Sequence, residues 1–598
     1  MENKKQAIVL SGVAIVALLA LIIGATYAYF RASGNSGSNT DINVTTYTLD
    51  LLSFEMGSDI KINADQTSFA SGKGNATGST FAKAILTANN KTNTATKNYY
   101  MYLNISNNTF TYTQNENTPE LLLTITDVSG NAITSITGLT YKTVIDGKGT
   151  SVSGFDITTK SGLLTLFDNR EITASPTKTE EWNVTVTFVN YNVNQTGNAG
   201  KSFNAKLMIQ QEEYELTLAD ICAGKTLSDC VISQYTGTQG DNALYYHNST
   251  LTNGAGDNSY RYAGGDYVLT EAGKATGATM MIGYNNSVTT ALIDFYCNGT
   301  KQYVGYASSC STSHYYLIKG DTTQYQTYNE ALNASVEKGY LTKDNVKNFV
   351  CFGSDATTCP TENLYRIIGV FNNHVKLIKY DYAKSSLLGT DGDFSQEYTS
   401  NYFSGEQGES PSSNSLYYWN NAGTNTWSAS KLNTVNLNTN FTTNIGTAWA
   451  NKIATTTWKV GGGTYANLRD AVPKTAYQYE VGSSASTTTY DAKIGLMYVS
   501  DYYYSASPSA WTLVGYNSDY TKSYASAKGE NWLYGGGWDW TISRRSDTSG
   551  NAFLVDRYGS VYDGNVSSYR GVRPSFSLLS STTYVSGSGS MSDPVRIN

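Results

Sequence analysis

The sequence has no excess of positive charge. Its 41 Lys and Arg residues are outnumbered by 48 Asp and Glu residues, so the formal net charge is −7. A protein that neutralises nucleic-acid phosphates needs an excess of Lys and Arg. We therefore expect no nucleic-acid partner.

Histidine is also scarce. The chain has only His247, His314 and His374, which leaves little material for histidine-based catalysis or zinc binding. It has no H-E-x-x-H, G-x-S-x-G, P-loop or dinucleotide-binding motif, and it lacks the spacing of an EF-hand calcium loop. We expect no cofactor, no metal ion and no enzymatic activity.

Proline and charged residues are few, whereas aromatic residues are abundant. Only 8 residues are proline and 15% are charged, against 48 tyrosines and 13% aromatic residues. Few prolines with many Thr, Val and Tyr favour strands, and the aromatic content is enough to bury a core. Because a domain usually has about 100–200 residues, a chain of 598 residues predicts two to four folded units. The sequence thus predicts a mainly β protein.

The N-terminus predicts export. Lys4 and Lys5 precede residues 7–30, which contain no charge over 24 positions. This run is longer than the apolar core of a cleavable signal peptide and long enough to span a membrane. Thr26-Tyr27-Ala28 nevertheless has the small residues of a cleavage site, so residues 1–28 are either a signal peptide or a membrane anchor. In both cases the positive-inside rule places the rest of the chain outside the cell or on its surface.

The cysteines form three near pairs in the sequence: Cys222/Cys230, Cys297/Cys310 and Cys351/Cys359. In an exported protein such pairs predict local disulfides. Free thiols are the alternative. Zinc is disfavoured because the spacings are not those of a C-x(2-4)-C knuckle.

Residues 29–212 show alternating apolar and polar positions, with polar turns between short runs. This period of two predicts an antiparallel β-sandwich. We expect strands at 47–52, 99–105, 121–126, 182–188 and 203–209.

The signal GATYAYF and this strand pattern together resemble the exported TasA/camelysin-type proteins, whose signals are cut by a SipW-type peptidase. The resemblance implies a β-sandwich at 29–212, cleavage after Ala28 and a relationship to biofilm-fibre subunits. The protease activity implied by the camelysin name is rejected, because residues 29–212 contain no histidine.

Residues 213–350 are expected to form a connector of helices and loops with an insertion that contains a disulfide. The spacing of apolar residues predicts one or two short helices in 214–235 and a helix over 328–339, where Gly339 suits a C-cap. The Gly-, Asn- and Asp-rich stretch 237–266 is expected to be a turn-rich loop.

Residues 351–598 contain spaced motifs: Cys351 to Cys359, Trp540-Thr-Ile-Ser543 and Gly571-Val-Arg573-Pro574. Together with 235–265, they resemble a bacterial surface-protein domain related to the C-type-lectin-like fold of formylglycine-generating enzymes. The resemblance implies a C-type-lectin-like α+β domain at 351–598, and it makes 267–347 an insertion. The chain departs from the enzymes, because no cysteine follows Cys359, and from calcium lectins, because E-P-N and Q-P-D are absent.

Several side chains of this region have two possible roles. Arg573 is expected to form a fork to buried carbonyls or a carboxylate, with ligand contact as the alternative. Trp532 and Trp540 are expected in the core, although a tryptophan can also stack on a sugar.

Apolar residues between Gly495 and Arg570 suffice for a strand core, which leaves a set of tyrosines and their neighbours for loops and solvent-facing positions. Tyr with Ser, Gly and Asn is typical of binding surfaces, with plain surface tyrosines as the alternative. The candidate ligand-binding residues are Tyr502, Tyr503, Tyr504, Tyr534, Trp538, Tyr558, Tyr562, Asn565 and Tyr569.

The sequence leads to three hypotheses for function. The first is a non-catalytic bacterial surface adhesion protein, with a lectin-like head on a β-sandwich stalk, that binds a protein or glycan of a host or neighbouring cell. The second is a matrix or fibre subunit that self-assembles through its N-terminal sandwich. The third is a carbohydrate-active hydrolase, which needs a pair of carboxylates in a cleft.

Overall fold

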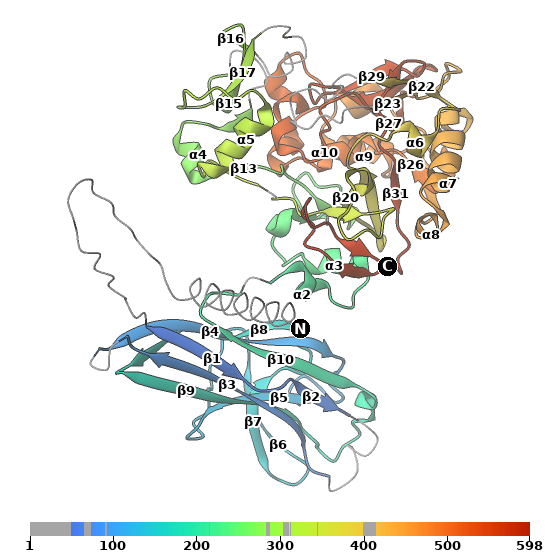
Figure 1. Cartoon of the computed structure of the whole chain (residues 1–598). Coiled ribbons are helices and arrows are strands. Elements are labelled where there is room, and N and C mark those ends of the chain that lie inside the picture. The colour runs from blue at the N-terminus through green and yellow to red at the C-terminus, as the bar shows by residue number, and fades with distance from the viewer. Residues whose placement is uncertain are drawn as a thin grey trace, which may run out of the picture. The chain divides into compact units, whose positions relative to one another are not determined.

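The computed structural model describes residues 50–64, 73–89, 93–214, 216–282, 288–302, 310, 313–343, 345–398 and 414–598. The predicted signal or anchor at 1–28 lies outside these ranges. Within them, no helix is both long enough and apolar enough to cross a membrane. The chain divides into two compact units, Met1–Glu215 and Leu216–Asn598 (Figure 1).

The first unit consists of two antiparallel sheets. One has six strands in the order β1-β3-β9-β5-β7-β6, and the other has four in the order β2-β10-β4-β8. The strands are β1 (Leu51–Met56), β2 (Ile60–Asn63), β3 (Ala76–Thr87), β4 (Ala95–Asn108), β5 (Leu121–Asp127), β6 (Tyr141–Ile145), β7 (Ser151–Asp156), β8 (Gly162–Ala174), β9 (Thr177–Phe188) and β10 (Ser202–Gln210). The structure has strands at four of the five predicted positions. β1 overlaps the fifth, 47–52, only at residues 51–52, and residues 47–49 lie outside the described ranges. Five further strands were not predicted.

Alternation of side chains gives the two sheets a shared core. Phe203, Ala205, Leu207 and Ile209 of β10 are buried, whereas the residues between them are more exposed. They belong to one apolar cluster with residues of both sheets, including Trp182 of β9. The period of two that predicted these strands is therefore the pattern that builds this core.

The second unit is built on a seven-stranded sheet. Its path is β11-β12-β20-β21-β31-β26, and β19 pairs with β20 beside it. The strands are β11 (Leu244–Tyr246), β12 (Tyr260–Tyr262), β19 (Phe349–Cys351), β20 (Leu364–Phe371), β21 (His374–Lys379), β26 (Ile494–Gly495) and β31 (Ser575–Ser577). Helices α2 (Leu218–Cys222) and α3 (Leu227–Ser233) precede them, as the sequence predicted.

The predicted domain boundary at residue 351 is wrong. β11 and β12 come from the stretch expected to be a turn-rich loop, yet β12 pairs directly with β20. Leu244 and Tyr262 are buried in the same core as residues of β20 and β21. Short strands of this kind are hidden in a polar stretch because only a few of their side chains enter the core.

The predicted insertion folds around a small core of its own. That core contains Leu292, Ile293, Phe295, Tyr328 and Leu332. Its elements are β13 (Val268–Leu269), α4 (Glu271–Ala275), β14 (Met280–Ile282), β15 (Ala291–Cys297), β16 (Thr300–Gln302), β17 (His314–Ile318), α5 (Tyr328–Glu337) and β18 (Leu341–Thr342). The helix predicted at 328–339 is confirmed as α5, and Gly339 follows its C-cap with φ +71°.

The remainder of the second unit surrounds the seven-stranded sheet with short elements (Figure 1). The helices are α6 (Ser385–Leu388), α7 (Thr442–Asn444), α8 (Thr447–Ala450), α9 (Pro473–Glu480) and α10 (Val499–Tyr504), and a π-helix at Leu432–Phe441 leads into α7. The strands are β22 (Phe394–Tyr398), β23 (Asn414–Tyr418), β24 (Thr456–Lys459), β25 (Thr489–Ala492), β27 (Asp539–Arg544), β28 (Asn551–Val555), β29 (Val561–Asn565), β30 (Tyr569–Arg570), β32 (Tyr584–Ser586) and β33 (Arg596–Ile597). The protein is thus mainly β, and its strand pairs are almost all antiparallel.

All three predicted disulfides are confirmed. The bonds join Cys222 to Cys230, Cys297 to Cys310 and Cys351 to Cys359. Each closes a short local loop, with sequence separations of 8, 13 and 8 residues.

Breaking the Cys351–Cys359 bond is expected to loosen the loop that leads into β20. Cys351→Ser paired with Cys359→Ser should lower the free energy of unfolding by about 2–3 kcal/mol, because the unfolded chain regains the entropy of an open loop. Urea denaturation of the double variant and the parent measures this. An unchanged midpoint would show that the loop is held by other contacts.

Candidate functional site

The tyrosines predicted to form a binding face are mostly in the core. Tyr502, Tyr503 and Tyr504 are 0%, 0% and 1% exposed, and every residue of helix α10 is buried. Tyr534 is 3% exposed. The prediction that these four side chains are exposed is therefore wrong, although Tyr534 does lie in a loop.

Hydrogen bonds to backbone carbonyls explain why these rings can be buried. Tyr502 donates to Gly559 O at 2.8 Å, Tyr503 to Leu468 O at 2.7 Å, Tyr504 to Asn253 O at 3.1 Å and Tyr534 to Arg557 O at 2.5 Å. A buried tyrosine is stable where its hydroxyl finds an acceptor. Counting apolar residues alone therefore underestimates how many aromatic rings a core can take.

The other candidates are more accessible but do not form one stack. Trp538 and Tyr558 are half-buried, and Asn565 is exposed. Tyr562 is 37% exposed and packs on Tyr516, whereas Tyr569 is 41% exposed and packs on Tyr418. The expectation of exposed tyrosines is correct only for these last two.

A different part of the second unit contains a larger cavity. A cavity of about 280 Å³ opens beside β12, β21, β24, α9 and α10. We call it the aromatic–charged cavity. Its lining is Asp257, Ser259, Arg261, Phe371, Asn372, Lys376, Thr456, Thr457, Trp458, Lys459, Tyr477, Val481, Tyr498, Ser500, Asp501 and Ser577.

Two ion pairs form part of its wall. Lys376 Nζ lies 2.6 Å from Asp501 Oδ2, and Arg261 Nη2 lies 2.6 Å from Asp257 Oδ2. Arg261, Lys376 and Asp501 are at most 7% exposed. Burial raises the pKa of Asp257, but the Arg261 charge and hydrogen bonds from Ser259 outweigh it and lower that pKa to about 2. The carboxylate of Asp257 is therefore ionised at neutral pH.

Aromatic rings hold the two cations in place. Lys376 Nζ lies 4.6 Å from the Tyr498 ring centroid and 5.3 Å from that of Trp458. The Arg261 guanidinium lies 5.3 Å from the Tyr477 ring and 4.7 Å from the Phe371 ring. Such cation–π contacts fix the charges against flat apolar surfaces.

A buried carboxylate anchors the start of helix α10, which carries Asp501 into the wall. Glu480, 3% exposed, accepts from the backbone N–H groups of Val499 at 2.9 Å and Ser500 at 2.8 Å. It also accepts from the hydroxyls of Ser500, at 2.6 Å, and Ser543. Asp501 itself accepts from the Tyr498 N–H at 2.8 Å. Glu480 and Asp501 together therefore fix the first turn of helix α10.

No protein-family model matches the chain, and no curated protein matches it. The described residues also contain no group of three or more His, Cys, Asp or Glu side chains that could hold a metal ion. The site is therefore interpreted from its own chemistry.

Sequence reasoning missed this cavity, although one signal was present. Arg261 stands inside the strand Tyr260–Tyr262, and Lys376 stands inside the apolar strand His374–Lys379. A cation within a strand of the central sheet is unfavourable when it is buried, unless it is paired. The ion-pair partners come from other segments, so only the fold brings them together.

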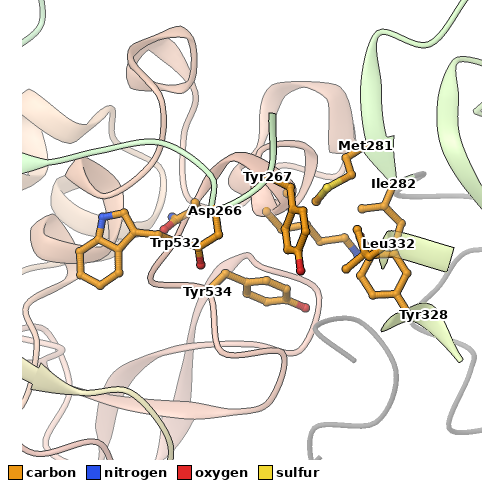
Figure 2. Close-up of a pocket in the computed structure, with 11 residues that line it drawn as sticks. Asp266, Tyr267, Met281, Ile282, Tyr328, Leu332, Trp532 and Tyr534 are labelled. Carbon is orange, nitrogen blue, oxygen red and sulfur yellow. The ribbon is translucent and has the colours of Figure 1, made fainter. Parts of the chain in front are cut away.

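A second, smaller cavity lies where the insertion meets the loop around Trp532 (Figure 2). Its lining includes Asp266, Tyr267, Met281, Tyr328 and Tyr534. Its volume is about 40 Å³, which is room for water but not for a sugar ring. We do not assign a ligand to it.

A buried histidine lies close to the aromatic–charged cavity and predicts sensitivity to acid. His247 is 0% exposed, accepts the Ala255 N–H at Nδ1 and packs edge-on against Tyr504. Burial, followed by the positive charge of Arg261, lowers the pKa of His247 well below its usual value, whereas Asp257 opposes that shift.

Because the folded state keeps His247 neutral while the unfolded chain takes up a proton below about pH 6.5, stability is full above that pH and falls as the pH drops below it. We expect the free energy of unfolding to decrease between pH 7 and pH 5. His247→Asn, which retains an acceptor for Ala255, should reduce this decrease. Denaturation of both proteins at the two pH values measures it, and equal decreases would assign the acid sensitivity to other groups.

Proposed function

We propose that the protein is an exported bacterial surface adhesion protein whose second unit binds a glycan in the aromatic–charged cavity. The observation that carries the proposal is the combination of flat rings with fixed charged groups around one opening. Phe371, Tyr477, Tyr498 and Trp458 supply the rings, and the two ion pairs supply donors and acceptors.

A sugar ring suits this lining. It has an apolar C–H face, which packs on aromatic rings, and a rim of hydroxyls, which donate to carboxylates and accept from Lys and Arg. The volume of about 280 Å³ is near the lower end of small-molecule sites. Asn372 and Thr457 are exposed at the opening and can contact a second sugar residue.

The same charges favour binding over hydrolysis. A glycosidase needs one carboxyl group that is protonated near neutral pH to act as the general acid. Asp257 and Asp501 each form an ion pair at 2.6 Å, and the pKa of Asp257 is about 2. The carboxylate of Asp257 is therefore not suited to donate a proton to a leaving group.

Three features support the location and the architecture in this proposal. The disulfides are typical of proteins that fold outside the cytoplasm. The paired sheets of the first unit, around one core, suit a sandwich-type stalk. The mixed second unit, with short helices around a sheet, suits a lectin-like head. The N-terminal segment would provide either export or attachment to the membrane.

A glycan array probed with residues 29–598 tests the proposal. Binding of a glycan is expected, and Tyr477→Ala should weaken it at least about tenfold, because an aromatic ring at a binding site carries much of the affinity. Tyr479→Ala is the matched control: it removes a tyrosine from the same helix, but Tyr479 is 41% exposed and does not line the cavity. Equal binding by the two variants, or no binding by the parent protein, would contradict the proposal.

A further inference from the structure

Strand β21 carries two lysines that serve different faces of the sheet. Lys376 and Lys379 are three residues apart, and side chains alternate along a strand, so they point to opposite faces. Lys376 lines the aromatic–charged cavity. Lys379 lines a separate cavity of about 300 Å³, which we call the Lys379 cavity. Its lining is Gly353, Thr361, Glu362, Asn363, Tyr365, Lys379, Asp381, Tyr382, Lys384, Ser386, Leu387, Asn444 and Ile445.

The ammonium group of Lys379 has an unusual environment. The residue is 3% exposed, and its Nζ lies 5.7 Å from the Tyr365 ring centroid. In the part of the chain that the structure describes, Nζ donates no hydrogen bond and has no carboxylate within ion-pair distance, and it is not fully enclosed, so it is open to the cavity. Lys376 on the other face shows the contrast, because its Nζ lies 2.6 Å from Asp501. A buried charge without a direct partner is unfavourable.

We propose that the Lys379 cavity binds the carboxylate of a small acidic ligand, with the Lys379 ammonium as its direct counter-ion. The ligand oxyanion would accept charge-assisted hydrogen bonds from Nζ, which no side chain accepts in the structure. This inference goes beyond the proposed glycan site and concerns a different cavity.

The charges around the cavity agree with this assignment. Burial, with a smaller contribution from Lys384, lowers the pKa of Lys379 to about 8, although Asp381 and Glu362 act in the opposite direction. The attraction of these two carboxylates is thus insufficient to offset burial. An anion in direct contact would raise the pKa of Lys379 again.

The rest of the lining limits the ligand class. Glu362 and Asp381 would repel a second negative charge, so a ligand with one carboxylate fits best. Asn363 and Asn444 offer amides, which pair with hydroxyl groups. A monosaccharide-sized acidic sugar, either free or at the end of a glycan, combines one carboxylate with hydroxyls.

Titration calorimetry of the full exported chain, residues 29–598, tests the proposal with acetate, D-glucuronate and N-acetylneuraminate. At least one of these carboxylates should bind, and neutral D-glucose should bind at least about tenfold more weakly than D-glucuronate. Lys379→Met should abolish the binding. If acetate, D-glucuronate and N-acetylneuraminate all fail to bind, the proposal is overturned.

Two further measurements do not depend on how well Lys379→Met folds. Glu362→Gln, at an exposed position, should raise the affinity about threefold by removing a repulsive charge. Affinity in the parent should fall about tenfold between pH 7 and pH 9, as Lys379 loses its proton. A flat pH profile together with no effect of Glu362→Gln would contradict the role of Lys379.

The two sites are distinguished by their variants. Tyr477→Ala should leave carboxylate binding at the Lys379 cavity unchanged, and Lys379→Met should leave glycan binding at the aromatic–charged cavity unchanged. Loss of carboxylate binding in Tyr477→Ala would place the anion in the aromatic–charged cavity and overturn this inference.

Discussion

Replacing Arg573 with alanine is expected to lower the free energy of unfolding of the second unit by about 3–5 kcal/mol. Arg573 is 4% exposed, and its Nε and Nη2 lie 2.6 Å and 2.5 Å from Asp539 Oδ2. Nη2 also donates to the Leu533 carbonyl at 2.7 Å. Asp539 is 2% exposed, so the substitution leaves a buried carboxylate and a buried carbonyl without their donor.

The protonation of Asp539 moderates this loss at low pH. Burial raises the pKa of Asp539 to about 6, even though Arg573 lowers it. Without Arg573 the acid takes up its proton more readily, so the loss should be smaller at pH 5 than at pH 8. Arg573→Lys retains the charge but not the several N–H donors of the guanidinium. Its free energy of unfolding should lie between those of Arg573→Ala and the parent.

Urea denaturation followed by tryptophan fluorescence measures these losses. Trp182 is the one tryptophan in the first unit, so 9 − 1 = 8 tryptophans report on the second. Lys522→Ala is the control, because its ion pair with Asp519 is exposed, and its midpoint should match the parent. An Arg573→Ala midpoint equal to that of Lys522→Ala would mean that the buried pair does not hold the fold.

Replacing Glu480 with alanine should cost about 3 kcal/mol or more and also weaken ligand binding. Four donors, from Val499, Ser500 and Ser543, lose their shared acceptor, and buried donors without acceptors are costly. Because Glu480 fixes the start of helix α10, Asp501 would lose its position beside Lys376.

Glu480→Gln separates the two effects. It retains one acceptor oxygen but turns an amide N–H₂ towards the remaining donors, so its loss of stability should be smaller than that of alanine. Denaturation gives the stability, and glycan affinity below the melting range gives the effect on the site. Full affinity in a folded Glu480→Ala protein would contradict the positioning role.

Local patterns predicted much of the fold. The disulfides, helix α5 and the strands predicted in the first unit follow from sequence separations, a capped apolar pattern and alternating apolar positions, all within short segments. Arg573 was also predicted to form a fork, because a cation between apolar strand residues needs buried acceptors. The strands β11 and β12 were missed, because their pairing with the main sheet is not a local property.

The candidate site could not be predicted from the sequence, for the same reason. Tyr504 is buried because its hydroxyl reaches Asn253, which is 251 residues away in the chain. The aromatic–charged cavity takes its lining from residues between 257 and 577, and no motif connects them. The tyrosine-rich segments that prompted the binding hypothesis are largely core, whereas the site contains charges that the sequence showed only as isolated cations in strands.

Hydrogen exchange with and without the best glycan tests the central claim most directly. Glycan binding in the aromatic–charged cavity predicts slower exchange in peptides covering 456–459 and 473–480, which form β24 and α9 beside it. Exchange in the first unit and around Tyr562 and Tyr569 should be unchanged. Protection at residues 558–569, with none at 456–480, would contradict the cavity assignment and return the binding site to the exposed tyrosines.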